Sequence, residues 1–193
     1  MKWDEVFIII FPENAGLDEY GCDPVIVAAE AMIARYNIKH ENCFSLNRVM
    51  DSPFHDISAN CMKVLNSKKT KLIVVSHREK LIKMFTPDKF ATLIKFCGGE
   101  EISYITFKSC NIGRDDYLDK LKELLPKVGL FSAYKHEVFL HTKINKSKIS
   151  YCIRADNSIE SYLEYINLKL PDLMRKKIVK GVNYRRGLMT QKL

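Results

Sequence analysis

Short runs of apolar, β-favouring residues alternate with amphipathic segments over the first two thirds of the chain. The strongest runs cover residues 6–11, 72–76, 102–107 and 128–133, and a weaker run covers 43–46. An unbroken apolar run such as 6–11 is typical of a strand that is buried on both faces of a parallel sheet. The pattern therefore predicts four firm strands and one weak strand.

Helices are predicted between these strands, because the gaps begin with helix-starting residues. Asp23 and Thr86 each stand before a proline, which is the preferred order of N-cap and first helical residue. Ser52 also precedes a proline, and the apolar spacing behind it predicts a helix over 52–65. The acidic pair at 115–116 suits the positive N-terminus of a further helix.

The alternation of strands and helices predicts an α/β fold, a three-layer sandwich with a mostly parallel central sheet flanked by helices. After residue 134 the rhythm changes to that of a C-terminal β-hairpin, over 136–154. We expect one α/β domain over 1–156, which includes the hairpin. Residues 157–193 are expected to form a basic helical extension that packs on the same domain, with its last helical segment beginning at Pro171.

The composition adds a basic imbalance to this picture. The chain has 31 Lys and Arg against 23 Asp and Glu, which gives a net charge of +8, and no acidic residue follows Asp172. A basic C-terminal surface suits an anionic ligand, and the alternative is an ordinary solvated terminus. Nucleic acid binding is not expected, because it would rest on this tail alone.

The cysteines and the apolar stretches bear on the compartment. The six cysteines are scattered without the C-x-x-C spacing of a zinc site, so we expect no metal and reduced thiols. No apolar stretch approaches the roughly 18 residues of a membrane span, and the N-terminal segment lacks the features of a signal peptide. The sequence thus predicts a cytoplasmic protein, or one that a non-classical route delivers into a host cytosol.

Two reactive side chains follow two of the predicted strands. His77 comes directly after the strand at 72–76, and Cys110 comes shortly after the strand at 102–107. The carboxyl ends of parallel strands meet at one edge of a sheet, where α/β proteins bind ligands. An imidazole held beside a thiol is the minimum for a cysteine nucleophile. The inert alternatives are an exposed histidine and a buried structural cysteine.

The motifs around these two residues resemble those of the caspase-like cysteine peptidases of clan CD. The likeness is carried by V-V-S-H at the end of one strand and S-C-N-I-G after the next. It is closest to the cysteine protease domains of RTX toxins and clostridial glucosylating toxins. The resemblance extends over about residues 4–155, although only the histidine and cysteine strands carry specific motifs.

The resemblance implies a cysteine endopeptidase that cleaves a protein or peptide substrate, as a toxin-like or effector protease. Cys110 would be the nucleophile of a catalytic dyad, and His77 would protonate the leaving amine. Arg78 and Asn111 are the candidates for the oxyanion hole and for substrate contacts, and Asp23 is a candidate to orient the histidine. The chain departs from the family at Arg78, where those peptidases have a glycine.

In the toxin domains, a basic pocket beside the hairpin binds inositol hexakisphosphate as an allosteric activator. The resemblance therefore implies the same activator here, although the dyad itself requires no cofactor. The alternative is that the basic residues of this region are ordinary exposed side chains. The candidate anion-binding residues are Lys143, Lys146, Lys148 and Arg154.

Two other functions stay open from the sequence. One is a catalytically degenerate, caspase-like binding module in which Arg78 occludes or reuses the cleft. The other is an α/β protein that binds an anion, a nucleotide or an inositol phosphate. Against a nucleotide, neither G-x-G-x-x-G nor G-x-x-x-x-G-K-[ST] is present.

Overall fold

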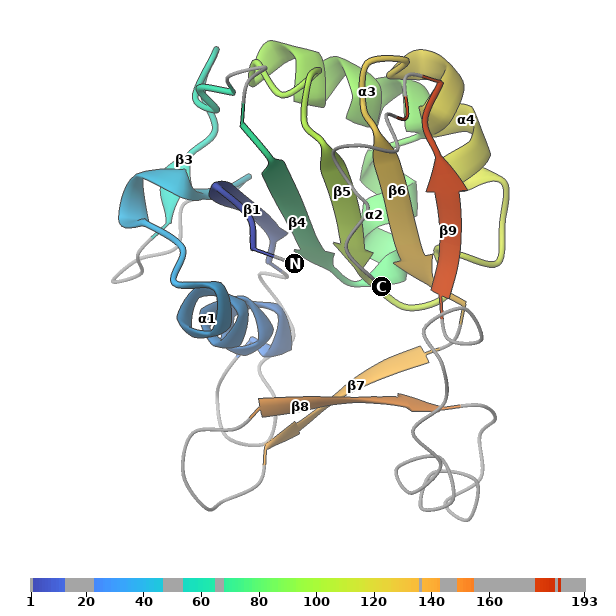
Figure 1. Ribbon diagram of the computed structural model, residues 1–193. Coiled ribbons are helices and arrows are strands. Elements are labelled where there is room, and N and C mark those ends of the chain that lie inside the picture. Colours follow the sequence, from blue (N-terminus) through green and yellow to red (C-terminus); the bar gives the residue numbers. More distant parts are fainter. Residues whose placement is uncertain are drawn as a thin grey trace.

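The computed structural model describes residues 2–12, 23–46, 54–64, 68–135, 137–142, 149–154, 176–182 and 184. Its main sheet has seven strands in the order β3-β2-β1-β4-β5-β6-β9 (Figure 1). Neighbouring strands are parallel except for β6 and β9, which are antiparallel. The strands of this sheet are β1 (Glu5–Phe11), β2 (Cys43–Ser45), β3 (His55–Asp56), β4 (Thr70–Ser76), β5 (Tyr104–Lys108), β6 (Leu130–Tyr134) and β9 (Lys176–Lys180).

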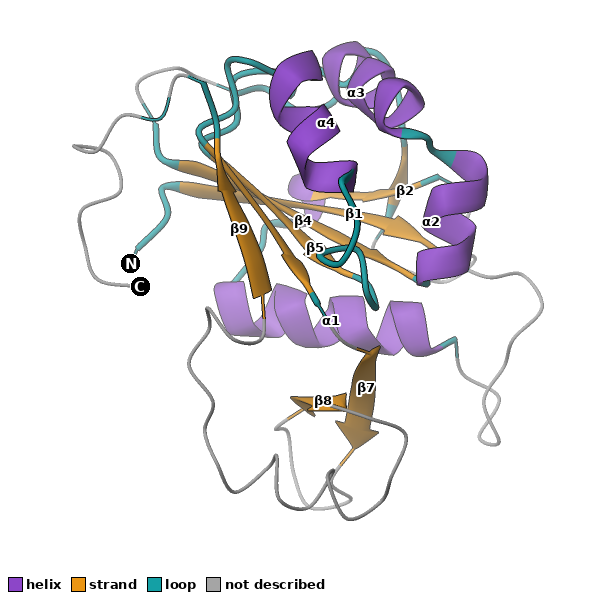
Figure 2. Ribbon diagram, turned by 90° about the vertical axis from the view of Figure 1, so that its right-hand side faces the viewer, coloured by secondary structure: helices purple, strands orange, loops and turns teal. Residues whose placement is uncertain are grey.

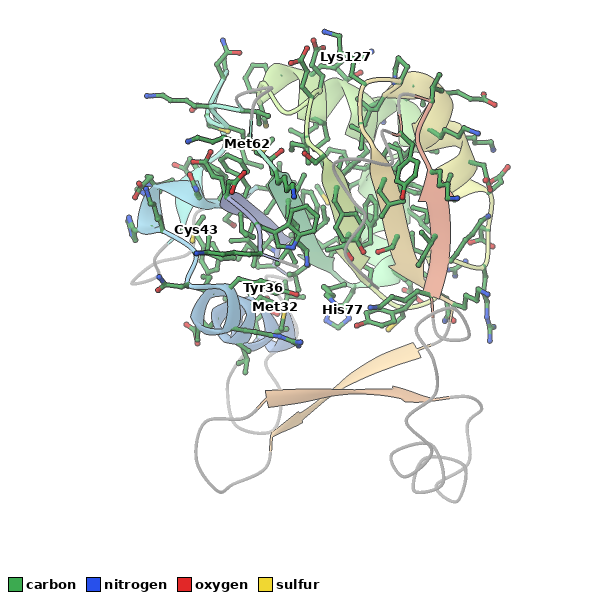
Figure 3. All side chains as sticks on the ribbon, viewed as in Figure 1. Met32, Tyr36, Cys43, Met62, His77 and Lys127 are labelled. Carbon is green, nitrogen blue, oxygen red and sulfur yellow. The ribbon has the colours of Figure 1, made fainter. Side chains whose placement is uncertain are left out.

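Helices cover both faces of this sheet, so the predicted α/β fold with a mostly parallel sheet is confirmed. Helix α1 lies on one face, and α2, α3 and α4 lie on the other (Figure 2). Met32 and Tyr36 are on the side of α1 that faces the sheet (Figure 3). The helices are α1 (Pro24–Tyr36), the 3-10 turn η1 (His40–Asn42), α2 (Arg78–Met84), α3 (Pro87–Phe96) and α4 (Tyr117–Leu124).

The two predicted N-caps are confirmed. Asp23 precedes α1, and its Oδ1 accepts a hydrogen bond of 2.8 Å from the backbone N–H of Val25. Thr86 precedes α3, and its Oγ1 accepts a hydrogen bond of 3.5 Å from the backbone N–H of Lys89. A cap of this kind satisfies one of the four backbone donors that a helix start leaves free.

The predicted helix over 52–65 is wrong within the described residues. His55–Asp56 form β3, which pairs with β2 at the edge of the sheet, and a turn follows at 59–60. Ile57 and Cys61, two of the positions predicted to face the core, still pack against it, and so does Met62, which the spacing did not predict. Pairing with the open edge of the sheet satisfies backbone N–H and C=O groups of this segment. Helix propensity reports only the local preference of the residues, so it does not include the gain from this pairing.

Part of the predicted helical extension is a strand. Lys176–Lys180 form β9, which pairs antiparallel with β6 and covers its outer edge. The β-branched pair Ile178 and Val179 favours a strand. Residues 157–175, including the helix start predicted at Pro171, lie outside the described residues.

The predicted hairpin is confirmed as a separate two-stranded antiparallel sheet. Its strands are β7 (Glu137–Thr142) and β8 (Ile149–Arg154) (Figure 1). Among the described residues, none of the helices has the length and the apolar character needed to cross a membrane.

Candidate functional site

The carboxyl ends of β4 and β5 bring His77 and Cys110 to one edge of the sheet. The last registered pair of these strands is Val75 with Lys108. Beyond that pair, the hydroxyl groups of Ser76 and Ser109 are hydrogen-bonded at 2.7 Å, and both side chains are buried. His77 and Cys110 are the next residue on each strand, and both are half-buried (Figure 3 labels His77).

Arg78 connects this edge to the loop that follows β5. It begins α2, and its Nη2 donates to Asp115 Oδ2 at 2.8 Å. The two side chains are 39% and 47% exposed, so solvent screens this ion pair and it contributes at most about 1 kcal/mol. The Nε–H of the same guanidinium group is buried and has no hydrogen-bond partner.

Asn111 has the second buried polar atom without a partner at this edge. Its backbone adopts the left-handed conformation, with φ +56°, which asparagine tolerates better than most residues. The turn is closed by the backbone N–H of Arg114, which donates to the Asn111 carbonyl at 3.0 Å. The side-chain Oδ1 of Asn111 is buried and has no hydrogen-bond partner.

The loop that carries Asn111 is held tightly against the end of β6. The backbone N–H of Gly113 donates to the Tyr134 carbonyl at 2.8 Å. A Cβ atom at Gly113 would lie only 2.7 Å from the Ala133 carbonyl oxygen, so only glycine allows this approach. On the other side, the Lys80 ammonium of α2 donates to the Pro12 carbonyl beyond β1. Hydrogen bonds therefore tie the loops at this edge to their neighbours, from β1 to β6.

Among the remaining predicted site residues, only Asp23 and Arg154 lie within the described part of the chain. Asp23 has the capping role at α1 given above. Lys143, Lys146 and Lys148 lie outside the described residues, and Arg154 is the last residue of β8. No group of three or more His, Cys, Asp or Glu side chains in the described part of the chain is arranged to hold a metal ion.

The sequence analysis missed a buried lysine at the opposite edge of the sheet. Lys71, the second residue of β4, is 6% exposed, and its ammonium donates to Tyr36 Oη at 3.0 Å. It also lies over the rings of Tyr36, Tyr104 and Trp3, at 4.2, 5.3 and 5.7 Å from their centroids. Burial, and then the nearby charges of Lys108, Lys176 and Arg35, lower the pKa of Lys71 to about 7.

A signal for this lysine was present in the alternation of polar residues along two further strands. Thr106 and Lys108 of β5 and Ser132 and Tyr134 of β6 occupy every second position. Thr106 Oγ1 and Ser132 Oγ are 3.0 Å apart, and Lys108 Nζ donates to Tyr134 Oη at 2.9 Å. Side chains at every second position lie on the same face of a strand. These four residues therefore form a polar patch on one face of the sheet, although the runs that contain them are mostly apolar.

No protein-family model matches the chain, and no curated protein matches it significantly. Among solved structures, the chain is similar to pyrroline carboxylate reductase from Plasmodium falciparum with NADP bound, at 17% sequence identity and a TM-score of 0.36. The similarity covers 86% of this chain and 54% of that chain, so this chain spans about half the length of the reductase.

The predicted cysteine endopeptidase is not upheld: none of the comparisons finds a peptidase, and the similar structure is a reductase. The structure adds a physical reason at Arg78, where the resemblance calls for a glycine. Its side chain pairs with Asp115 in the loop that follows Cys110, so the position after His77 carries a bulky charged group instead of a glycine. The toxin-like and effector roles are left without support. A TM-score of 0.36 carries no argument for a reductase or for a bound dinucleotide either, and the caspase-like resemblance stays an untested prediction.

Proposed function

We propose that this protein binds a small ligand with a carboxamide or lactam edge, at the carboxyl edge of β4 and β5. The observation that carries the proposal is the pair of buried polar atoms there without partners, Arg78 Nε and Asn111 Oδ1. Leaving such an atom unpaired costs about 1–3 kcal/mol. Buried polar groups are nearly always paired, so a persistent exception calls for an occupant.

The position of the two atoms supports a ligand as that occupant. The chain passes from β1 to β2 on one side and later to β4 on the other side of β1. The direction in which strands are added to the sheet therefore reverses between β1 and β4. Open α/β sheets bind ligands at such a point, outside the carboxyl ends of the strands. Arg78 stands directly beyond the end of β4 there, and its ion pair to Asp115 reaches the loop of Asn111.

The chemistry of the two atoms suggests the class of ligand. An Nε–H group is a donor only, and a side-chain amide oxygen is an acceptor only. A carboxamide or lactam presents one acceptor oxygen and one N–H donor, so it offers a partner of the right kind to each of the two atoms. A carboxylate would satisfy Arg78 and would leave Asn111 Oδ1 facing another acceptor.

The test compares ligands that differ only in this edge. Glutamine is paired with glutamate, and uracil with 1,3-dimethyluracil, which lacks the N–H donors. Binding to the purified protein is measured by isothermal titration and by protein-observed NMR. We expect at least one amide or lactam member to bind about tenfold more tightly than its counterpart, which corresponds to about 1.4 kcal/mol.

Two asparagine variants locate the site. Asn111→Gly keeps the positive φ and removes the acceptor, so it should abolish the preference. Asn37→Gly is the matched control, because Asn37 also has a positive φ of 49° but ends α1. The proposal fails if both members of every pair bind equally, or if the preference survives in Asn111→Gly.

A further inference from the structure

Cys61 and Cys97 lie in two segments that backbone hydrogen bonds hold side by side. The N–H of Asn60 donates to the Phe96 carbonyl at 2.8 Å, and the N–H of Met62 donates to the Cys97 carbonyl at 2.9 Å. Cys61 stands between these two donors. These bonds place the two cysteine-bearing segments next to each other, and a disulfide requires Cα atoms about 4.4–6.8 Å apart.

Two glycines allow the segment at 60–62 to lie close to the residues that follow α3. Gly98 has φ +75°, and a Cβ atom there would lie 3.0 Å from the Met62 carbonyl oxygen. A Cβ atom at Gly99 would lie 2.6 Å from Met62 Cε. The residues that follow α3 therefore leave room for the segment at 60–62, and the fold itself sets the position of the two cysteines.

The two thiols differ in access and in protonation. Cys61 is half-buried and Cys97 is buried, and neither is in a disulfide. Their mutual hydrogen bond lowers the pKa of Cys61 well below its ordinary value, and it raises the pKa of Cys97, with burial adding to that rise. Cys61 is thus the thiolate that a reagent can reach, and Cys97 stays a protonated neighbour.

We propose that Cys61 and Cys97 form a reversible disulfide when the protein encounters a hydroperoxide. In the first step, the Cys61 thiolate attacks one peroxide oxygen, the O–O bond breaks, and Cys61 becomes a sulfenic acid while hydroxide or alkoxide leaves. In the second step, the Cys97 sulfur attacks the Cys61 sulfur, its proton goes to the departing hydroxyl, and water is released. The peroxide is reduced by two electrons, which the two thiols supply. This inference does not depend on the ligand site.

The consequence would be a covalent link between the segment after β3 and the end of α3. Such a link closes a long loop and restricts the unfolded chain. We expect the oxidised protein to melt about 5–10 °C above the reduced protein. Dithiothreitol should reverse the shift.

Peptide mapping tests the linkage directly, because trypsin leaves each cysteine in a peptide of its own. The fully reduced protein is treated with increasing hydrogen peroxide, blocked with an alkylating reagent and digested. We expect peptide 49–63, which contains Cys61, to be linked to peptide 96–108, which contains Cys97. Each disulfide lowers the mass of the intact protein by about 2 Da, because two hydrogen atoms are lost. We expect the amount of the linked peptide pair to account for most of this decrease.

Variants and an internal control separate the steps. In Cys97→Ser, Cys61 should accumulate as a sulfenic acid that dimedone traps, and the melting shift should be lost. Buried Cys43 is the internal control, since burial and then Glu41 raise its pKa to about 11, and it should react at least tenfold more slowly than Cys61. The proposal is overturned if peptides 49–63 and 96–108 stay unlinked while other thiols oxidise, or if Cys61 links to a different cysteine.

Discussion

The buried polar groups at the two edges of the main sheet differ in whether they have hydrogen-bond partners. At the amino edge, Thr70 and Ser103 exchange hydrogen bonds, each backbone N–H donating to the hydroxyl of the other residue at 3.1 Å. Lys71 beside them has Tyr36 as a hydrogen-bond acceptor and three aromatic rings around its ammonium. At the carboxyl edge, Arg78 Nε and Asn111 Oδ1 are buried without hydrogen bonds.

The amino edge has one buried oxygen without a hydrogen bond, but a nearby charge compensates it. Glu5 Oε2 is buried without a hydrogen bond, but Lys68 Nζ lies 3.8 Å away and balances its charge. The other oxygen of the same carboxylate accepts a hydrogen bond of 3.4 Å from Asn42. Asn111 Oδ1 has no comparable compensation among the described residues.

The difference indicates that the two edges serve different purposes. Natural proteins satisfy buried polar groups where only stability is at stake, and they retain unsatisfied or strained groups at sites of function. Apart from Lys71, whose burial has a cost of its own, the polar groups described at the amino edge are paired or charge-balanced, whereas two buried atoms at the carboxyl edge are left unpaired at a cost in stability. Each of the following predictions tests this division, from the largest expected effect to the smallest.

Lys71→Met should raise the free energy of unfolding most. The folded pKa of Lys71 is about 7 against an ordinary value of 10.5. Between these values the unfolded chain binds a proton that the folded protein does not, so stability rises with pH across this window. The shift corresponds to a penalty of up to about 4 kcal/mol at pH 7, of which about 2 kcal/mol disappears by pH 9.

Urea unfolding at pH 7 and pH 9 measures this penalty. The wild-type protein should gain about 2 kcal/mol relative to Lys71→Met between the two pH values. A parallel pH dependence in both proteins would show that the aromatic rings and Tyr36 already compensate the buried charge. The amino edge would then be fully optimised, which would make the contrast with the carboxyl edge sharper.

Ser103→Ala should lower the free energy of unfolding by about 1–3 kcal/mol, because it leaves the buried N–H of Thr70 without an acceptor. Ser109→Ala is the matched change at the carboxyl edge, where only the hydroxyl of Ser76 loses a partner. Urea unfolding should show a smaller loss for Ser109→Ala, since no backbone group is left unpaired. Equal losses would contradict the view that the amino edge is the stabilising one.

Asn111→Gly should raise the free energy of unfolding, by about 1 kcal/mol more than Asn37→Gly does. Both changes place glycine at a positive φ, so that gain is shared. Only Asn111→Gly also removes a buried oxygen without a partner, because Asn37 is exposed. Thermal unfolding of the two variants without ligand measures the difference. A destabilised Asn111→Gly variant would mean that the Asn111 side chain supports the loop, against the proposed ligand role.

The elements that could be predicted from the sequence are those with several independent signals. The helix after Asp23 has a cap, a proline at its first position and an apolar stripe, and the strand that ends at Ser76 is a continuous apolar run. Because parallel strands end at one edge, their carboxyl ends also placed His77 and Cys110 together. The geometry of that edge followed from topology rather than from any single motif.

The elements that could not be predicted depend on contacts between distant segments. Helix α2 spans only Arg78–Met84, which is too short for a clear apolar period. Strand β9 comes from a basic segment with good helix formers, and its strand form depends on the open edge of β6. The ion pair of Arg78 with Asp115 joins residues 37 positions apart in the sequence, and no local pattern predicts such a pair.

Asp115→Asn should lower the free energy of unfolding by less than about 1 kcal/mol. It removes the charge that holds the half-exposed Arg78 guanidinium and leaves an amide oxygen that still accepts a hydrogen bond. Salt should erase the difference, since the screening length falls to about 3 Å at 1 M. Glu79→Gln in the exposed pair with Lys83 of the same helix is the control, with an even smaller loss. A loss of 2 kcal/mol or more in the free energy of unfolding for Asp115→Asn would show that the ion pair of Arg78 stabilises the fold. The unpaired Nε would then result from that structural role, and the contrast between the two edges would not hold.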